Sequence, residues 1–297
     1  MVRSRRSSPT NLEPLESRIL LSNVTATLTN GGDLVVNGDN DRNVFSIRKL
    51  GNQFRIDGQA GTTINGSLQT FLVEAASDDL RISLKGGYNS VFVNVDIVDD
   101  VMIKGGKGVD EIWFGGDVGG NVGISTSNGK DTVFLRGSAQ NVSVKTGNGA
   151  DKIAIPELLL SGDLNIATGK GADEVTLSLP ASVPGVDVGD DLTVQTGSGD
   201  DQVLMRAQIE DQMKIKMGSG DDLLAIEDSI LGTSNNLDGG SGDDVLILHN
   251  LTAPPNAQGN FRRFEDGVGD QDIPDAVFEA LFDEVLDPFS IFVTPIP

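Results

Sequence analysis

The residues of this chain that could do chemistry are aspartates recurring beside paired glycines. Six segments share the frame x-Gly-x-Gly-x-Asp, and Thr126–Asp131 is a weaker seventh copy. The aspartates that close the seven segments are Asp110, Asp131, Asp151, Asp173, Asp201, Asp222 and Asp244. Calcium prefers carboxylate and carbonyl oxygens, and glycine permits the close backbone approach of a tight turn. The frame therefore predicts calcium sites made by these seven carboxylates and the carbonyls of their turns.

The residues around each closing aspartate indicate the elements that position it. Apolar residues stand nine and seven places before it and two and four places after it, as Leu192, Val194, Val203 and Met205 do around Asp201. This period of two on both sides of a turn predicts strand, turn and strand in every repeat. One repeat cannot bury its apolar face alone, but stacked repeats can. The sequence therefore predicts an all-β fold, a parallel β-solenoid.

The repeat fixes the expected size of the solenoid. The closing aspartates are 20 to 22 residues apart, except for one interval of 28 that contains the insertion Pro180–Gly185. The same frame continues back to Asn89 and Asn43, and an enlarged coil fits between them, with its turn at 57–69. We therefore expect about ten coils of about 21 residues over residues 33–250. At the N-terminal end, Phe45–Ile56 is expected to form a hairpin or a first coil.

Stacking makes the carboxylates electrostatic neighbours. At about 4.8 Å, two of them repel by about 3.5 kcal/mol at an effective dielectric near 20, which favours a bound cation. Asp200, Asp221 and Asp243 precede the last three closing aspartates, so we expect the strongest calcium sites there. The other interpretation is that the column points into water, where screening weakens the repulsion. Four lysines in the middle turns could also neutralise part of the charge: Lys107, Lys130, Lys152 and Lys170.

Other repeated polar residues are expected to be structural. A column ten places before the closing aspartate is predicted to cap the opposite turn, with metal binding as the alternative: Asp79, Asp100, Asn121, Asn141, Asp163 and Asp191. A threonine column five places before it has inward parity and is predicted to stack inside: Thr126, Thr146, Thr168 and Thr196. Asn43 and Asn89 hold the closing position without a charge, so we expect them to cap turns.

Composition excludes several classes of protein. Of 297 residues, 44 are acidic and 22 are basic, with 33 Asp against 11 Glu and a net charge of −22. Nucleic acids and anionic membranes recruit basic surfaces, so neither is an expected partner. Without cysteine and with one histidine, His249, the chain has no disulfide, thiolate or multi-histidine metal centre. No apolar run is long enough to predict a membrane span.

Two stretches carry family resemblances. Gly105–Trp113 and Gly239–Ile247 match the nonapeptide G-G-x-G-x-D-x-U-x, so the repeat resembles the RTX, or haemolysin-type, calcium-binding β-roll. That resemblance implies calcium between successive turns, although the nonapeptide occurs here once per coil and not twice. Leu12–Ser22 resembles the LEPR-XLL motif of exported planctomycete-type proteins. The second resemblance implies an extracellular or cell-surface location.

These patterns divide the chain into three parts. Residues 1–23 are expected to be a flexible basic arm for export or targeting, residues 24–250 the solenoid, and residues 251–297 a C-terminal cap. The cap contains a predicted amphipathic helix at 275–286, with an apolar stripe formed by Val277, Phe278, Leu281, Phe282 and Val285. We expect this helix to dock on the last coil. The alternative is a helix that recognises a partner or the export machinery.

We therefore expect a non-catalytic, exported, calcium-binding β-solenoid with a structural or adhesive role at the cell surface. Its expected partners are calcium ions and a cell-surface or extracellular polysaccharide or protein. The alternative function is a β-helix polysaccharide lyase or hydrolase acting on acidic glycans. Repetition argues against this alternative, because the acidic pairs recur in every late coil whereas an active site is needed once.

Overall fold

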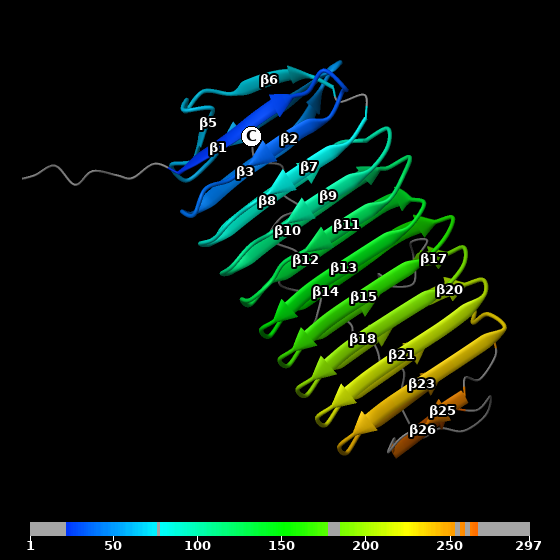
Figure 1. The fold of residues 1–297 in the computed structure, drawn as a ribbon. Helices are drawn as coiled ribbons and strands as arrows, with labels where there is room; N and C mark the ends of the chain where they lie inside the picture. Colours follow the sequence, from blue (N-terminus) through cyan, green and yellow to red (C-terminus); the bar gives the residue numbers. More distant parts are fainter. Residues whose placement is uncertain (1–21, 76–77, 178–184, 253–255, 259–261, 267–297) are drawn as a thin grey trace, which may run out of the picture.

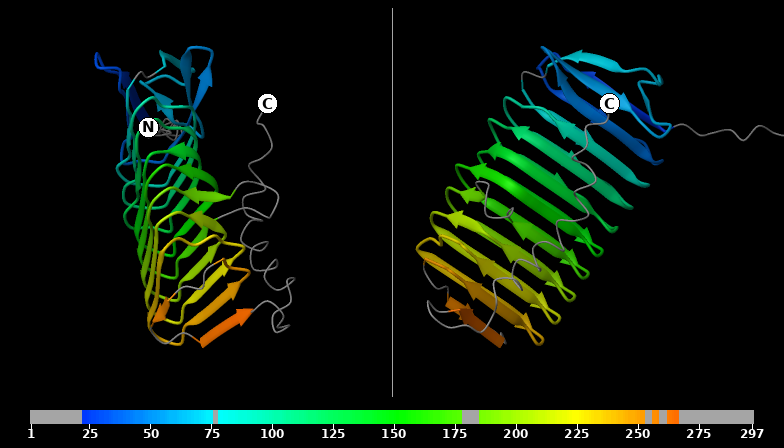
Figure 2. Two further views of the ribbon diagram at one scale, coloured as in Figure 1. Left: turned by 90° about the vertical axis from the view of Figure 1, so that its right-hand side faces the viewer. Right: turned by 180° about the vertical axis from the view of Figure 1, so that it is seen from behind.

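The protein is a parallel β-solenoid, as the repeat predicts. The computed structural model describes residues 22–75, 78–177, 185–252, 256–258 and 262–266. These residues form two long sheets that face each other and run the length of a stack of coils (Figures 1 and 2). No helix occurs among the described residues. Residues 1–21 of the predicted arm at 1–23, most of the insertion Pro180–Gly185 and the predicted helix at 275–286 lie outside them. The last residue of the predicted arm, Asn23, is described and begins the first strand.

Each coil contributes one strand to each sheet. Sheet I has the order β25 (Asn256–Gln258), β23 (Ser234–Ser241), β21 (Gln212–Ser219), β18 (Leu192–Ser198), β15 (Leu164–Lys170), β13 (Val142–Asn148), β11 (Val122–Ser125), β9 (Val101–Lys104), β7 (Leu80–Ser83), β2 (Leu34–Asn37), β1 (Asn23–Leu28) and β5 (Thr63–Ile64). Sheet II has the order β26 (Arg262–Asp266), β24 (Val245–His249), β22 (Leu223–Glu227), β19 (Gln202–Met205), β16 (Glu174–Leu177), β14 (Lys152–Leu160), β12 (Thr132–Ala139), β10 (Asp110–Asp117), β8 (Asn89–Asn94), β3 (Asn43–Leu50), β4 (Gln53–Gly58) and β6 (Phe71–Glu74). Two short strands, β17 (Val186–Val188) and β20 (Ala207–Ile209), extend sheet II beside the end of β14.

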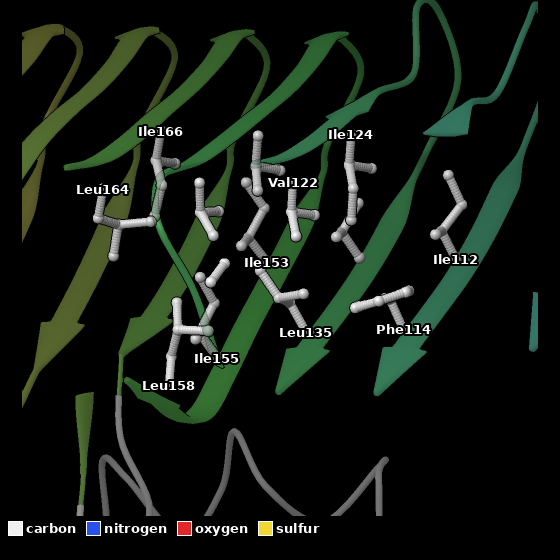
Figure 3. Close-up of a cluster of buried hydrophobic side chains, with 14 of the residues drawn as sticks. Ile112, Phe114, Val122, Ile124, Leu135, Ile153, Ile155, Leu158, Leu164 and Ile166 are labelled. Atoms are coloured by element: carbon white, nitrogen blue, oxygen red, sulfur yellow. The ribbon is translucent and has the colours of Figure 1, made fainter. Parts of the chain in front are cut away.

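The register places each repeat position in one column. Ile124 pairs with Ile103 of the preceding coil and with Val144 of the following one. The predicted alternation holds, so the residues before and after each turn meet in a thin core between the sheets. Figure 3 shows this layer, with side chains from β10, β12 and β14 facing those from β11 and β15. Seven coils, from β9–β10 to β23–β24, carry the closing aspartate, and two earlier ones carry Asn43 and Asn89.

The N-terminal end of the solenoid lacks the enlarged coil that the sequence predicts between Asn43 and Asn89. The segment from Gln53 to Glu74 is not an enlarged coil, because β3 pairs directly with β8 and the coil between them does not exist. Instead β3, β4 and β6 form an antiparallel meander, which begins with a tight hairpin at Leu50–Gln53. Phe54 and Ile56 are buried as predicted, since alternation is the same in a meander and in a coil. The hairpin interpretation of Phe45–Ile56 is therefore confirmed, and this antiparallel end caps the first coil.

Candidate metal site

The seven closing aspartates stand in one buried column at the turn that joins sheet I to sheet II. Asp110 begins β10, and each of the others directly precedes its sheet II strand. Their exposed fractions range from 0 to 2%, so the interpretation that this column points into water is wrong. Since the residues two and four places after each aspartate face the core, the pleat turns the aspartate itself inward.

One oxygen of each carboxylate is used by the stack. The Oδ1 atom of Asp201 accepts a hydrogen bond from the backbone N–H of Asp173 at 2.8 Å, and Asp173 Oδ1 accepts one from the backbone N–H of Asp151. The same bond joins every neighbouring pair of the column from Asp110 to Asp244, at 2.8 Å for five pairs and 3.1 Å for the last. The column is thus a ladder of charge-assisted hydrogen bonds along one edge of the solenoid.

The glycines of the repeat are explained by the same close stacking. Gly169 and Gly171 have φ angles of 107° and 137°, where residues with a side chain are strained. A Cβ atom added to either would collide with a carbonyl oxygen of the preceding coil, that of Gly147 or Gly149. Glycine is therefore required by the approach of successive turns, whether or not an ion lies between them.

Stacking leaves the second carboxylate oxygen unexplained. In six of the seven aspartates Oδ2 is buried and has no hydrogen-bond partner: Asp131, Asp151, Asp173, Asp201, Asp222 and Asp244. Asp110 differs, because its oxygens accept hydrogen bonds from Asn89 Nδ2 at 2.7 Å and from the Gly106 N–H at 2.9 Å. An unpaired buried carboxylate oxygen is costly, so these six oxygens call for a cation or a proton.

Neighbouring donors approach the carboxylates without full hydrogen-bond geometry to Oδ2, among them the Ser127 N–H beside Asp131 and a threonine hydroxyl beside each of four column members. The Thr126 hydroxyl lies near the carboxylate of Asp131 and opposes the rise of its pKa. Its proton, however, goes to the carbonyl oxygen of Thr146 in the next coil at 2.9 Å. Thr146, Thr168 and Thr196 donate to the following coil in the same way, which confirms the predicted internal threonine stack.

Burial makes six of the seven column carboxylates harder to ionise. Removal from water raises the pKa of Asp151, Asp201 and Asp222 from 3.8 to about 6, and the charges of neighbouring column members add to this effect. Burial likewise raises the pKa of Asp110, Asp131 and Asp173. The N–H donors of the ladder oppose the rise without cancelling it. At neutral pH the column is therefore a line of poorly solvated negative charges, and a cation placed there would relieve it.

Asp200, Asp221 and Asp243 lie on the other side of the backbone. All three are exposed, and the backbone N–H groups of Asp221 and Asp243 donate to the carboxylates of Asp200 and Asp221 at 2.9 Å. They form a second, solvent-facing ladder, so the structure does not bring them into the buried column. The charges of Asp200 and Asp221 still raise the pKa of Asp222.

The column at the opposite turn caps backbone groups, as predicted. Asp79 Oδ1 accepts from the Asp100 N–H at 3.1 Å, and Asp100 Oδ1 accepts from the Asn121 N–H at 2.7 Å. The remaining members continue this chain of bonds: Asn141, Asp163 and Asp191. Two triplets near this edge bring carboxylate oxygens within 4.8 Å of one another: Asp78, Asp79 and Asp99, and Asp163, Asp190 and Asp191. Asp99 and Asp190 are exposed, so these triplets lack the burial that distinguishes the aspartate column.

Comparison with known proteins found no matching family model, no matching curated protein and no matching solved structure. In the part of the chain that the structure describes, no helix has the length and apolarity needed to cross a membrane. The buried aspartate ladder is consistent in general with an RTX-like β-roll, and its function has to be argued from its own geometry.

Proposed function

We propose that this protein is a non-catalytic, exported β-solenoid that binds calcium along the aspartate column and has a structural or adhesive role at the cell surface. The observation that carries the proposal is the row of six buried carboxylates whose Oδ2 atoms have no hydrogen-bond partner. A hard cation is the ligand class that such oxygens favour. When bound, calcium would neutralise charges that the stack itself leaves uncompensated.

The geometry narrows the set of candidate ligands. The proposed calcium ligands are Asp131, Asp151, Asp173, Asp201, Asp222 and Asp244. Asp110 is a weaker candidate because both of its oxygens already accept hydrogen bonds. Asp200, Asp221 and Asp243 face solvent, where they would contribute through their charge.

Location and role rest on separate observations. The resemblance of Leu12–Ser22 to an export-associated motif supports secretion, and extracellular calcium is concentrated enough to fill weak sites. The carboxylate columns of the described residues recur in coil after coil as ladders or caps, which is typical of a structural element and not of a single active site. A long, acidic, regular rod of this kind suits a surface or matrix component that meets polysaccharide or protein partners.

One groove would offer the lyase alternative a place to act. A shallow groove of about 550 Å³ on the outer face of sheet I is lined in part by Asp79, Arg81, Asp100 and Met102. Asp79 is paired with Arg81 at 2.6 Å and also caps the Asp100 N–H, while Asp100 caps Asn121. These acids are therefore committed to the capping column, which favours a structural role for the groove.

Thermal melting of the full chain tests the proposal. Far-UV circular dichroism in millimolar calcium and in EGTA should show a higher melting midpoint with calcium. Equal midpoints would overturn the calcium claim. Incubation with acidic polysaccharides should release no unsaturated or reducing sugars, and their release would establish the lyase or hydrolase alternative.

A further inference from the structure

The outer face of sheet I carries basic side chains on a chain that is acidic overall. Figure 1 looks onto this face, where the strands from β7 to β21 lie side by side. These seven described strands contain no acidic residue, although the whole chain has 44 acidic and 22 basic ones. Basic side chains alternate with the buried residues of these strands and are exposed: Arg81, Lys104, Lys145, Lys214 and Lys216. The face is therefore a local concentration of positive charge on a molecule of net charge −22.

The strand register arranges these cations in two rows along the stack. The first row runs from Lys104 through Lys145 to Lys216. The second row runs from Arg81 to Lys214. Since neighbouring strands are about 4.8 Å apart, the backbones at Lys104 and Lys145 are separated by about 10 Å and those at Lys145 and Lys216 by about 14 Å. The rows therefore offer aligned and widely spaced charges to a linear ligand.

The lysines of the two rows are not committed to ion pairs. In the part of the chain that the structure describes, the ion pairs involve none of the four lysines. Arg81 differs, because it pairs with Asp33 at 3.3 Å and with Asp79 at 2.6 Å. The four ammonium groups are thus available to an anionic ligand.

The second row also crosses the floor of the shallow groove on sheet I. Met102, Ser143 and Asn165 line this groove in part, and Gly123 lies between Met102 and Ser143 in the register. A Cβ atom added at Gly123 would have no neighbour nearer than 3.9 Å, so the missing side chain hollows the face at this strand. Met102 is 47% exposed and offers an adaptable apolar contact. The acids of the groove cap backbone groups, but its floor presents hydroxyl, amide and apolar groups beside the lysines.

We propose that the outer face of sheet I binds an acidic polysaccharide. One polysaccharide chain would lie along the solenoid axis, with its carboxylates at the lysine rows and its hydroxyl groups over the groove floor. The inference rests on the proposed adhesive role, for which it names the ligand class and the surface. Calcium takes no part in this contact, because the aspartate column is buried at the turn and does not reach the outer face of sheet I.

Acidic side chains at both edges of the face restrict the ligand to a narrow chain. Asp99 and Asp190 are exposed near the capping edge, and Asp200 and Asp221 are exposed at the other edge. A strand of four residues spans about 13 Å, so a duplex or a membrane surface would bring its phosphates against these acids. A single nucleic-acid strand carries a charge at every nucleotide, whereas cations occupy only some of the coils. A polysaccharide with spaced carboxylates fits this pattern better.

Affinity for polygalacturonate, a carboxylated polysaccharide, tests the inference in the full chain. Substituting Lys104, Lys145 and Lys216 together by glutamine should weaken binding by about tenfold or more, since three favourable charge contacts are lost. Added salt should weaken binding of the wild-type protein. Methyl-esterified polygalacturonate, which lacks the carboxylate charges, should bind much more weakly than the unmodified polymer.

The matched control removes three other exposed lysines from the Gly-rich turn. Substituting Lys107, Lys130 and Lys170 together by glutamine changes the net charge by the same amount and should leave the affinity unchanged. Equal losses of affinity in the two triple variants would show that binding depends on net charge and would overturn the assigned surface.

Gly123→Leu tests the groove without changing any charge. The new side chain has room, so the melting midpoint should stay near that of the wild-type protein. It would fill the hollow between Met102 and Ser143, so binding of polygalacturonate should weaken severalfold. An unchanged affinity would contradict the placement of the polysaccharide over the groove.

The calcium proposal and this inference can fail separately. Binding is measured in EGTA and in millimolar calcium, on protein shown to be folded by circular dichroism. Lysine-dependent binding in both, without a calcium-dependent melting midpoint, would refute calcium and support the polysaccharide face. A calcium-dependent midpoint without polygalacturonate binding would do the reverse. If the protein folds only with calcium, the two triple variants decide in calcium alone.

Three further results would overturn the inference. The first is binding that EGTA abolishes while the fold is retained, since calcium would then bridge the two partners. The second is undiminished binding of the esterified polymer. The third is tighter lysine-dependent binding to single-stranded DNA or to phosphatidylserine vesicles than to polygalacturonate.

Discussion

Replacing Asp201 by asparagine should have opposite effects on stability with and without calcium. In the ladder, Asp201 Oδ1 accepts the Asp173 N–H while Oδ2 is buried without a partner. An asparagine keeps the acceptor and removes the buried charge. The first coils already use this arrangement, since Asn89 occupies the same position and accepts from the side-chain amide of Asn43 at 2.8 Å.

The magnitude follows from the pKa of the carboxyl. A rise from 3.8 to about 6 means that ionised Asp201 costs about 3 kcal/mol in the folded state at neutral pH. The new amide N–H loses its own hydrogen bonds to water, at about 1 kcal/mol. Asp201→Asn should therefore stabilise the calcium-free protein by about 2 kcal/mol, which is about 4–8 °C in melting midpoint for a domain of this size.

In calcium, Asp201→Asn should destabilise the protein, because the variant lacks one carboxylate of the metal site. The assay is thermal melting at pH 7.5 in EGTA and in millimolar calcium, with Asp221→Asn as the exposed control that changes little in either condition. Destabilisation of equal size in both conditions would refute the buried-charge reasoning. Equal stabilisation in both would show that the column carries a charge penalty but holds no calcium.

Three further predictions concern the same column. Without calcium, the free energy of unfolding should fall as pH rises from about 3.8 to about 6, because a raised folded-state pKa means that folding favours the protonated acids. Denaturant unfolding at several pH values in this range measures the change, and a free energy of unfolding that rises with pH would contradict the prediction. Gly171→Ala should destabilise the protein by about 3 kcal/mol or more, since φ is 137° and a Cβ atom would meet the Gly149 carbonyl. Gly123→Ala is the control and should be near neutral, because the nearest atom to its Cβ would be 3.9 Å away. Equal losses of stability for the two variants in urea unfolding would refute the stacking argument. The double variant Asp79→Asn, Asp100→Asn should keep the calcium-induced rise in melting midpoint. Loss of that rise would show that calcium binds at the capping column and not at the buried column.

Much of the fold was predictable because the repeat imposes it. Apolar pairs around each closing aspartate, such as Val203 and Met205 after Asp201, could only meet in a stack of strands. The same alternation gives Asp201 inward parity, so its burial was also readable from the sequence. The prediction of an enlarged coil over 53–74 is wrong, since Phe54 and Ile56 alternate equally well in the antiparallel meander that this segment forms.

Other features depend on relations that no repeat encodes. The ladder bond from Asp173 to Asp201 requires knowing which side of the turn each backbone N–H faces. Asp200 and Asp201 are adjacent in sequence but lie on opposite faces, so a count of carboxylates at the turn does not reveal which of them belong to the buried column. The burial of Leu204 at an outward position of β19 could not be recognised, because a single apolar residue there does not change the pattern of the repeat.

The most direct test of the calcium claim is the number of calcium ions bound per folded chain, measured by equilibrium dialysis at millimolar free calcium. The structure predicts more than one ion for the wild-type protein. Substituting Asp201, Asp222 and Asp244 together by asparagine should reduce that number, and the same change at Asp200, Asp221 and Asp243 should reduce it less. A folded chain that binds no calcium, or equal losses in the two triple variants, would contradict the proposed role of the buried column.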